Sequence, residues 1–234
     1  RIKFVLQPIF CQQLGVFYKE EIPDELFKAF EKKLHKYRVR AYSFNEENTE
    51  RYSPKGESKV NYVLDLNRPY EEIFQNYSQS RRKDIKKAER LGVTVVKAKN
   101  TNSYLSLFKN HYAYLIKTVS IPFLKKFSDV LQDKNKLIHY DVLNNKFEII
   151  ASQFFLDSRN RKICIGFTRN KEKENHNSSA FIKNYLIKKL VNMNFQLDFE
   201  GSINPNIARF MEGFSPEKKH YTNYSNFTFK WVKI

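Results

Sequence analysis

Short runs with an apolar residue at every second position alternate along this chain with stretches of helical periodicity. Strand-like runs lie at 2–6, 12–17, 38–44, 60–66, 93–98, 136–143, 147–156, 161–168, 195–200 and about 221–232. Helical periodicity covers 23–36, 69–91 with a break at 78–80, 102–117, 122–132, 179–193 and 205–213. Because strands and helices alternate around a hairpin-rich middle, the pattern predicts an α/β fold with a mixed central sheet and flanking helices.

Polar segments separate these elements. Residues 45–59, NEENTERYSPKGESK, have no apolar run and are expected to form a loop. Gly92 is placed to end the preceding helix, and Asn144-Asn145 predicts a hairpin between two strands. The polar link 169–180, RNKEKENHNSSA, leads into the helix at 179–193.

Charge narrows the range of partners. The 234 residues include 42 Lys and Arg against 25 Asp and Glu, a net charge of +17. This sign suits nucleic acid, nucleotide phosphates or peripheral contact with an anionic membrane surface, although a Lys-rich composition without such a partner is the alternative. No run of about 18 apolar residues and no signal-peptide pattern occur, so a cytoplasmic protein without a transmembrane segment is expected.

The cysteines and the first residues lead to two further expectations. Cys11 and Cys164 lie in unrelated segments without metal-ligand spacing, so we expect buried free thiols, no disulfide and no metal site. The chain begins directly in a strand and without Met, which suggests that an N-terminal segment precedes it and that the first domain is incomplete.

The stretch DFEGSINPNIARFMEGF, residues 198–214, carries the strongest candidate chemistry. Asp198 and Glu200 share one face at the end of a strand, about 7 Å apart, and either could accept a proton from an attacking amine. Ser202 and Asn204 are placed to cap the following helix, and Arg209 is expected to reach inward. The structural alternative is an ion-pair cluster of Asp198, Glu200 and Arg209 that locks the turn.

A dense group of cations lies in SRRKDIKKAERLGV, residues 80–93. Arg81, Arg82, Lys83 and Lys86 are expected to face solvent or ligand, and phosphate is their natural partner. Lys87 and Arg90 extend the same surface. The alternative is a solvated helix face without a ligand.

Gln12 and Gln13, in the segment QPIFCQQLGVF at 7–17, are a second candidate binding element. Neutral amides can orient an acyl or peptide group without adding charge. Since neighbouring residues of a strand point to opposite faces, only one of the two is expected to reach a site. Hydrogen bonding at a strand edge or turn is the structural alternative.

Taken together, the segments 7–17, YVLDL at 62–66, 80–93 and 198–214 resemble the FemAB-type peptidyltransferase-like family, which is built from two GNAT-like acyltransferase lobes. The resemblance implies a partial N-terminal lobe at 1–66, a basic helical connection at 67–92 and a C-terminal lobe at 93–234. It further implies transfer of an acyl or aminoacyl group to an amine, with aminoacyl-tRNA as donor and a nucleotide-linked peptidoglycan precursor as acceptor.

One departure from the GNAT pattern concerns acyl-CoA. GNAT enzymes that bind acyl-CoA carry a glycine-containing turn whose backbone amides hold the pyrophosphate, but residues 168–181 contain no glycine. Asn177, Ser178 and Ser179 are still placed to cap the next helix. This departure favours a donor other than acyl-CoA, a lost activity, or a CoA site in the missing N-terminal lobe. No resident cofactor is expected, and acyl-CoA is a weakly supported donor. Because neither cysteine has a recognisable nucleophile context, we expect direct transfer without a covalent enzyme intermediate. Two alternatives remain open, a catalytically inactive RNA- or nucleotide-binding module and an acetyl-CoA-dependent N-acetyltransferase.

Overall fold

The computed structural model describes residues 3–116 and 118–227, and the chain divides into two compact units. The first unit holds the described residues of 1–61 and 218–234, and the second holds 62–217. This division differs from the expected one, since residues 62–92 group with the second unit and the last strand groups with the first.

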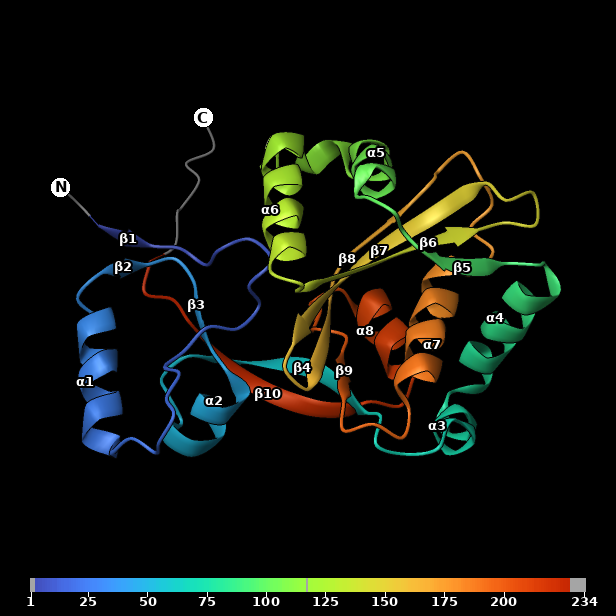
Figure 1. The fold of residues 1–234 in the computed structure, drawn as a ribbon. Coiled ribbons are helices and arrows are strands. Elements are labelled where there is room, and N and C mark those ends of the chain that lie inside the picture. The colour runs from blue at the N-terminus through green and yellow to red at the C-terminus, as the bar shows by residue number, and fades with distance from the viewer. Residues whose placement is uncertain (1–2, 117, 228–234) are drawn as a thin grey trace. The chain divides into compact units, whose positions relative to one another are not determined.

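The first unit is built around two helices and short strands (Figure 1). Strands β1 and β2 pair in parallel, and β10 lies between β3 and β4, which continues into the second unit at Tyr62. Its core consists of Phe27, Leu34, Val39, Phe44 and Tyr224. The elements are β1 Phe4–Val5, α1 Asp24–Leu34, β2 Arg38–Val39, β3 Tyr42–Phe44, α2 Glu46–Tyr52, β4 Glu57–Asp65 and β10 Glu217–Tyr224.

Two predictions for this unit were wrong. The segment expected to be a loop contains helix α2, which begins where the Asn45 side chain accepts a hydrogen bond from the Asn48 amide at 2.7 Å. The expected strand at 12–17 forms only an isolated bridge between Leu14 and Phe44. Of the last expected strand, residues 228–232 lie outside the described chain, and β10 ends at Tyr224.

The cap of α2 leads to a first testable prediction. Asn45→Ala removes the side-chain oxygen that satisfies a free amide at the helix start, and we expect a loss of about 1 kcal/mol in unfolding free energy. Urea denaturation measures this change. Asn45→Ser keeps a capping oxygen and should stay within a few tenths of a kcal/mol of the parent. Equal losses in both variants would contradict the capping role.

The second unit alternates helices and strands much as the sequence predicts. Helices α3 and α4 are separate, as expected from the break at 78–80, and Gly92 ends α4 with a left-handed φ of 70°. Within the described residues, no helix combines the length and apolarity needed to cross a bilayer. The elements are α3 Tyr70–Asn76, α4 Gln79–Arg90, β5 Thr94–Lys97, α5 Asn102–His111, the 3-10 turn Ala113–Leu115, α6 Ile121–Asp133, β6 Leu137–Leu143, β7 Ile149–Ser158, β8 Arg161–Arg169, α7 Ser178–Leu190, β9 Gln196–Asp198 and α8 Pro205–Glu212.

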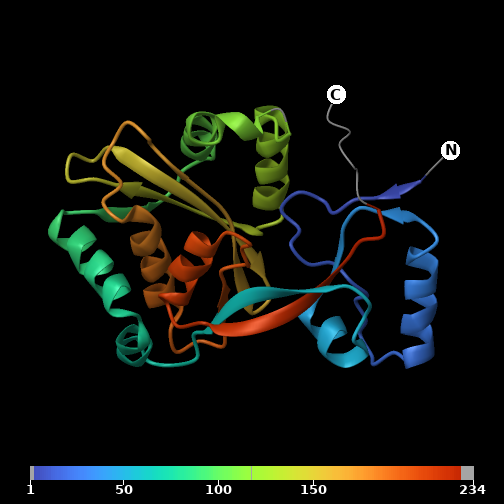
Figure 2. The same cartoon turned by 180° about the vertical axis from the view of Figure 1, so that it is seen from behind.

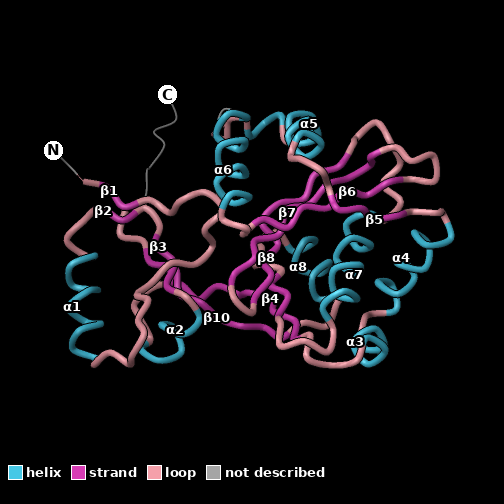
Figure 3. The backbone as a smooth tube through the Cα atoms, viewed as in Figure 1, coloured by secondary structure: helices cyan, strands magenta, loops and turns pink. Residues whose placement is uncertain are grey.

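The sheet of this unit has the strand order β4-β9-β8-β7-β6-β5. Only the β8–β9 pair is parallel, and the other pairs are antiparallel, so the predicted mixed α/β sheet is confirmed. Helix α5 packs against β7 and β8, whereas α7 packs against β6 and β7 from the opposite face (Figures 1 and 2). The tube in Figure 3 shows the strands between these two helical layers.

The core under α7 joins the basic helix to the sheet. Ala88 and Val93, from α4 and the residues after it, pack with Ile182 of α7 and with Val142 and Ala151 of the sheet. All five are almost fully buried. Helices α4 and α7 therefore form one layer on the face of the sheet where the candidate site lies.

Candidate active site

Strands β8 and β9 pair over only three residues and then separate. Their register ends at Ile163 and Asp198, after which β8 continues to Arg169 and the chain after β9 turns away. Directly past this point β8 carries a bulge, because Phe154 and Phe155 of β7 oppose Gly166 and Cys164 and leave an extra residue between them. A bulge bends the strand and interrupts pairing, so it helps to open a gap between the two strands.

A cavity of about 550 Å³ occupies this gap. Its walls come from β8, the turn after β9, and helices α7 and α8, with further contributions from β7, the loop before α7 and the end of α5. Its lining combines aromatic and apolar side chains with a few polar and ionisable groups, the composition usual for a small-molecule site. The lining residues are Tyr112, Gln153, Cys164, Ile165, Gly166, Phe167, Asn175, Ser179, Lys183, Phe199, Glu200, Gly201, Ser202, Asn206, Ile207, Phe210 and Met211.

Glu200 lines this cavity from the turn after β9. Its backbone adopts a left-handed φ of 60°, a strained conformation for a residue other than glycine, and its amide donates to Asp198 Oδ1 at 2.8 Å. Burial raises the pKa of the Glu200 carboxyl to about 8, and the negative charge of Asp198 adds to the rise. Glu200 is thus a half-buried carboxyl that changes protonation near neutral pH.

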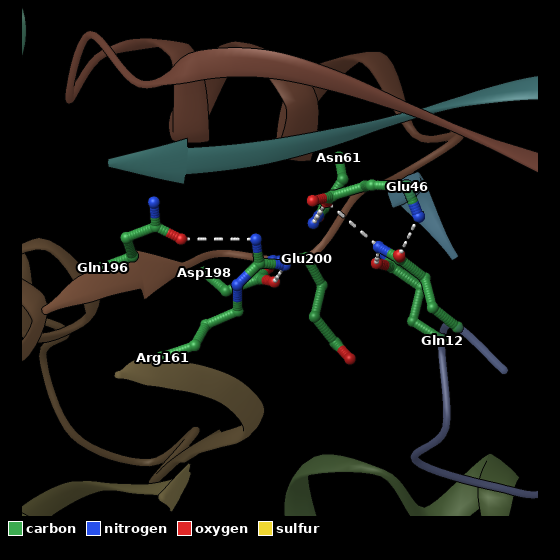
Figure 4. A network of polar contacts seen from close by, with 8 residues as sticks. Gln12, Glu46, Asn61, Arg161, Gln196, Asp198 and Glu200 are labelled. Atoms are coloured by element: carbon green, nitrogen blue, oxygen red, sulfur yellow. Dashed lines mark hydrogen bonds and ion pairs between the residues drawn. The ribbon is translucent and has the colours of Figure 1, made fainter. Parts of the chain in front are cut away.

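The Asp198 carboxylate holds the turn after β9. Its carboxylate is buried and accepts a hydrogen bond from Arg161 at 3.1 Å, while Gln196 accepts another from the same guanidinium at 3.3 Å. Figure 4 shows these contacts, with the Glu200 side chain directed away from them. Arg209 does not reach inward as expected, because it is exposed. The structural alternative of an ion pair between Asp198 and Arg209 is therefore also wrong, and Arg161 is the partner of Asp198 instead.

Ser202 and Asn204 order the segment that leads into α8. Asn204 caps the helix by accepting from the Asn206 amide at 2.9 Å, which agrees with the expected cap. The Ser202 hydroxyl accepts a hydrogen bond from the Asn204 amide at 3.1 Å, and Ser202 also lines the cavity. The two residues therefore connect the Glu200 turn to a helix that forms one wall of the site.

Lys183 is a cavity residue that the sequence reasoning missed. Its side chain is almost fully buried, and its ammonium donates to Gln153 Oε1 at 2.8 Å and to Ser179 Oγ at 3.2 Å. Burial lowers the pKa of Lys183 to about 8. A signal existed in the sequence, since Lys183 lies three residues after Ala180 and four before Ile187, on the apolar face of the helix.

The basic helix α4 exposes fewer of the expected cations than predicted. Lys83 and Lys86 are exposed, as expected. Arg81 is instead buried against the Phe210 and Phe214 rings, and it bonds Asp84 and the Phe210 carbonyl. Position 81 shares the apolar face of α4 with Ile85, which explains its burial.

Arg82 is half-buried and donates to the carbonyls of Gln75 and Tyr77 at the end of α3. It therefore has a structural role in joining the two helices. The exposed cations that remain on α4 form a patch, which we call the α4 basic patch and which consists of Lys83, Lys86, Lys87 and Arg90.

Gln12 and Gln13 belong to the first unit and bond to each other and to α2. Gln13 Nε2 donates to Gln12 Oε1 and to Glu46 Oε1, both at 3.3 Å, and Gln13 Oε1 accepts a hydrogen bond from the Glu46 amide. Their side chains thus meet rather than point to opposite faces, because this segment is not an extended strand. Asn61 donates to the same Glu46 carboxylate at 2.7 Å.

The glycine-free loop before α7 still turns through left-handed conformations. His176 and Asn177 have φ values of 46° and 56°. Asn177 precedes the helix but makes no side-chain cap, since its amide points to the Asp84 carbonyl. The amides of Ser178 and Ala180 donate to carbonyls within the loop. These two amides are therefore not available to a pyrophosphate group.

The cysteines show no sign of a nucleophilic role. Neither cysteine forms a disulfide in the described part of the chain, and Cys11 is exposed rather than buried as expected. Cys164 lines the cavity, and burial raises the pKa of its thiol to about 12, so it stays neutral near pH 7.

His139 lies between a serine and an aspartate but does not form a catalytic triad with them. It contacts both Ser152 and Asp141 through the same ring nitrogen, whereas the relay of a triad uses one ring nitrogen for each partner.

Three solved structures illustrate what this fold resembles. FemX matches with a TM-score of 0.61 and 8% identity, covering 86% of this chain and 76% of that one. L-PGS from Bacillus licheniformis matches with a TM-score of 0.53 and 12% identity, covering 88% and 73%. A conserved protein of unknown function from Bacteroides thetaiotaomicron VPI-5482 matches with a TM-score of 0.58 and 8% identity, covering 87% of this chain and 75% of that one. No curated protein sequence matches this chain.

At such low identities these matches show a shared fold, and the predicted α/β fold with a mixed central sheet and flanking helices is confirmed. The particular family comes from the sequence itself. The FemAB family model matches residues 8–138, more than half of the 234. The chain belongs to the FemAB family, as the resemblance of its separated segments predicts.

Proposed function

We propose that this protein transfers an acyl or aminoacyl group to an amine in the cavity between β8 and β9. The observation that carries the proposal is the Glu200 carboxyl, which lines the cavity and has a pKa of about 8. Such a group can take a proton from an amine near neutral pH, the task of a general base. Family membership and the FemX-like fold support the same reaction class.

In this mechanism the neutral amine attacks the acyl carbonyl carbon and forms the new C–N bond. Glu200, in its carboxylate form, accepts the proton that the nitrogen loses. The bond from the carbonyl carbon to the leaving oxygen then breaks, and the proton is returned to that oxygen. No covalent bond between enzyme and acyl group is required, which agrees with the neutral, buried thiol of Cys164.

For the donor we favour aminoacyl-tRNA over acyl-CoA. The loop before α7 contains no glycine, and two amides at the start of the helix are already bonded. The α4 basic patch offers four exposed cations to a polyphosphate such as RNA. The acceptor that fits the family is a nucleotide-linked peptidoglycan precursor. The residues proposed to act on it are Glu200 as base, Asp198 as its support and Ser202 in the cavity wall, while Asn204 caps the helix that forms this wall.

A ligand screen tests the proposal. Thermal unfolding of the full chain is measured with charged tRNA, with CoA esters and with UDP-linked muropeptides, because ligands that bind the native state raise the midpoint. Charged tRNA and the muropeptide are expected to stabilise the protein, and mixing them should yield an amide product. Stabilisation by acetyl-CoA with acetylation of an amine would favour the N-acetyltransferase alternative.

The α4 basic patch gives a second prediction. Lys83→Glu with Lys86→Glu should weaken tRNA binding by about 10-fold or more at low salt and flatten its salt dependence, because fewer counterions are released. Filter binding at several salt concentrations measures both effects. Lys126→Glu with Lys134→Glu, exposed cations elsewhere in the same unit, changes the net charge equally and serves as control.

Equal losses in the two double variants would mean that only the overall charge attracts RNA. Loss confined to the α4 variant, together with no amide product under any condition, would favour the inactive RNA-binding module. The inactive module and the transferase both predict tRNA binding by the α4 basic patch. They differ in the activity assay, because only the transferase forms an amide product.

A further inference from the structure

The ammonium of Lys183 has only neutral partners in the described part of the chain. Two of its three N–H donors reach the Gln153 amide oxygen and the Ser179 hydroxyl. No described carboxylate forms an ion pair with it. Removing an ammonium from water without a counter-charge is costly, so its burial calls for compensation.

Aromatic rings supply part of that compensation. The ammonium lies 5.2 Å from the centroid of Phe167 and 5.5 Å from that of Phe210, within the range of cation–π attraction. Both rings line the cavity together with Lys183 itself. The third donor of the ammonium therefore remains for a ligand in the cavity.

We propose that Lys183 binds a carboxylate of the substrate, so that the cavity accepts an amino acid or a short peptide with a free carboxyl group. A single ammonium flanked by an amide and a hydroxyl matches a monoanion with two oxygens. A phosphate dianion needs more donors than this wall provides. Asn175, Ser202 and Asn206 also line the cavity, and their neutral polar groups suit the amide groups of a peptide.

The proposal rests on the proposed function for the role of this substrate as the amine acceptor. Glu200 would then meet the amine and Lys183 the carboxylate of the same molecule. The binding itself does not depend on turnover. It can therefore succeed or fail independently of the transfer reaction.

A matched pair of probes tests the carboxylate directly. N-acetylglycine and N-acetylglycinamide differ only in the carboxylate, and neither has a reactive amine. In ¹⁵N–¹H NMR titrations of the full chain we expect N-acetylglycine to shift the signals of Gly166, Ser179 and Lys183 and to bind at least about 10-fold more tightly than the amide. This ratio corresponds to the loss of one charge-assisted contact.

Lys183→Met keeps the length and the apolar stem of the side chain, and it should abolish the preference for the carboxylate. Because a buried ammonium is costly, this variant should melt at or above the temperature of the parent. Inorganic phosphate is titrated in parallel. Equal affinities for the two glycine probes, or saturation by phosphate without a carboxylate preference, would overturn the proposal.

A pH titration tests the same contact without changing Lys183. It is performed on Glu200→Gln, which removes the other group that titrates near pH 8. The Cys164 thiol has a pKa of about 12, and burial raises the pKa of the Tyr112 hydroxyl. Burial lowers the pKa of Arg81, but a guanidinium is not deprotonated in proteins. N-acetylglycine affinity should therefore fall as pH rises above 8 and Lys183 loses its proton. An affinity that stays constant from pH 7 to 9.5 would contradict the proposal.

Two outcomes separate this inference from the transfer reaction. Carboxylate-specific binding with no amide product under any donor would leave the site assignment intact and remove the proposed function. Formation of the amide product without any preference for the carboxylate would support the proposed function and overturn the assignment of Lys183 as the carboxylate site.

Discussion

Glu200→Gln is expected to lower turnover by about 10²-fold or more while the fold and ligand binding are retained. Glutamine has the same shape but cannot take a proton, and a positioned general base contributes about 10²–10⁴-fold. Steady-state rates with the donor and acceptor found in the screen measure the loss. Turnover at the parent rate would exclude Glu200 as the base.

The pH dependence gives an independent check on this role. Because the carboxyl has a pKa of about 8, most molecules carry it protonated at pH 7, and the rate should rise through pH 8 as the base form appears. The Glu200→Gln variant should lack this rise. A parent profile that is flat between pH 6.5 and 9 would indicate that another group controls the reaction.

Stability should change in the opposite direction to activity. The pKa of Glu200 is raised in the native state, so its contribution to stability is complete below about pH 4.5 and is lost as pH rises through 8. Glu200→Gln should therefore be more stable than the parent at pH 8–9, by about 1 kcal/mol or more, and equal to it at pH 4. Unfolding of the variant at pH 7 would contradict this account.

Asp198→Asn is expected to lower the free energy of unfolding by about 2 kcal/mol, because a buried carboxylate that holds a guanidinium loses its charge. Asparagine can still accept the hydrogen bond from the Glu200 amide, so the decrease in unfolding free energy measures the contact with Arg161. Asp198→Ala removes both contacts and should cost more. Urea denaturation at pH 7 measures the series.

Asp129→Asn is the matched control. Asp129 forms an ion pair with Lys125 at 2.8 Å, but both side chains are exposed and the pair should contribute less than about 0.5 kcal/mol. If Asp198→Asn unfolds no more easily than this control, Asp198 does not hold the turn.

The sequence predicted most elements of the second unit because their signals are local. Alternating apolar residues define β6, β7 and β8, and Gly92 and Asn204 mark helix ends at the expected positions. The pairing of β8 with β9 and the bulge opposite Phe154 and Phe155 could not be predicted, since they depend on contacts between distant segments. The cavity depends on these contacts.

The errors also have local causes. Helix α2 was missed because its polar residues have no apolar periodicity, although Asn45 followed by two glutamates is a helix start signal. The charge of Arg81 predicts a surface position, although its place on the same helix face as Ile85 indicates burial. The charge of Lys183 likewise predicts a surface position, although its place on the apolar face of α7 indicates burial.

The left-handed turn at Glu200 has a consequence for how this site would change during evolution. Glycine would relax the backbone at this position, and an uncharged side chain would avoid burying a carboxyl. Such substitutions should therefore make the protein more stable at neutral pH. A gene copy released from selection for activity should lose this glutamate early, so the residue at this turn would distinguish working members of the family from those that have kept only the fold.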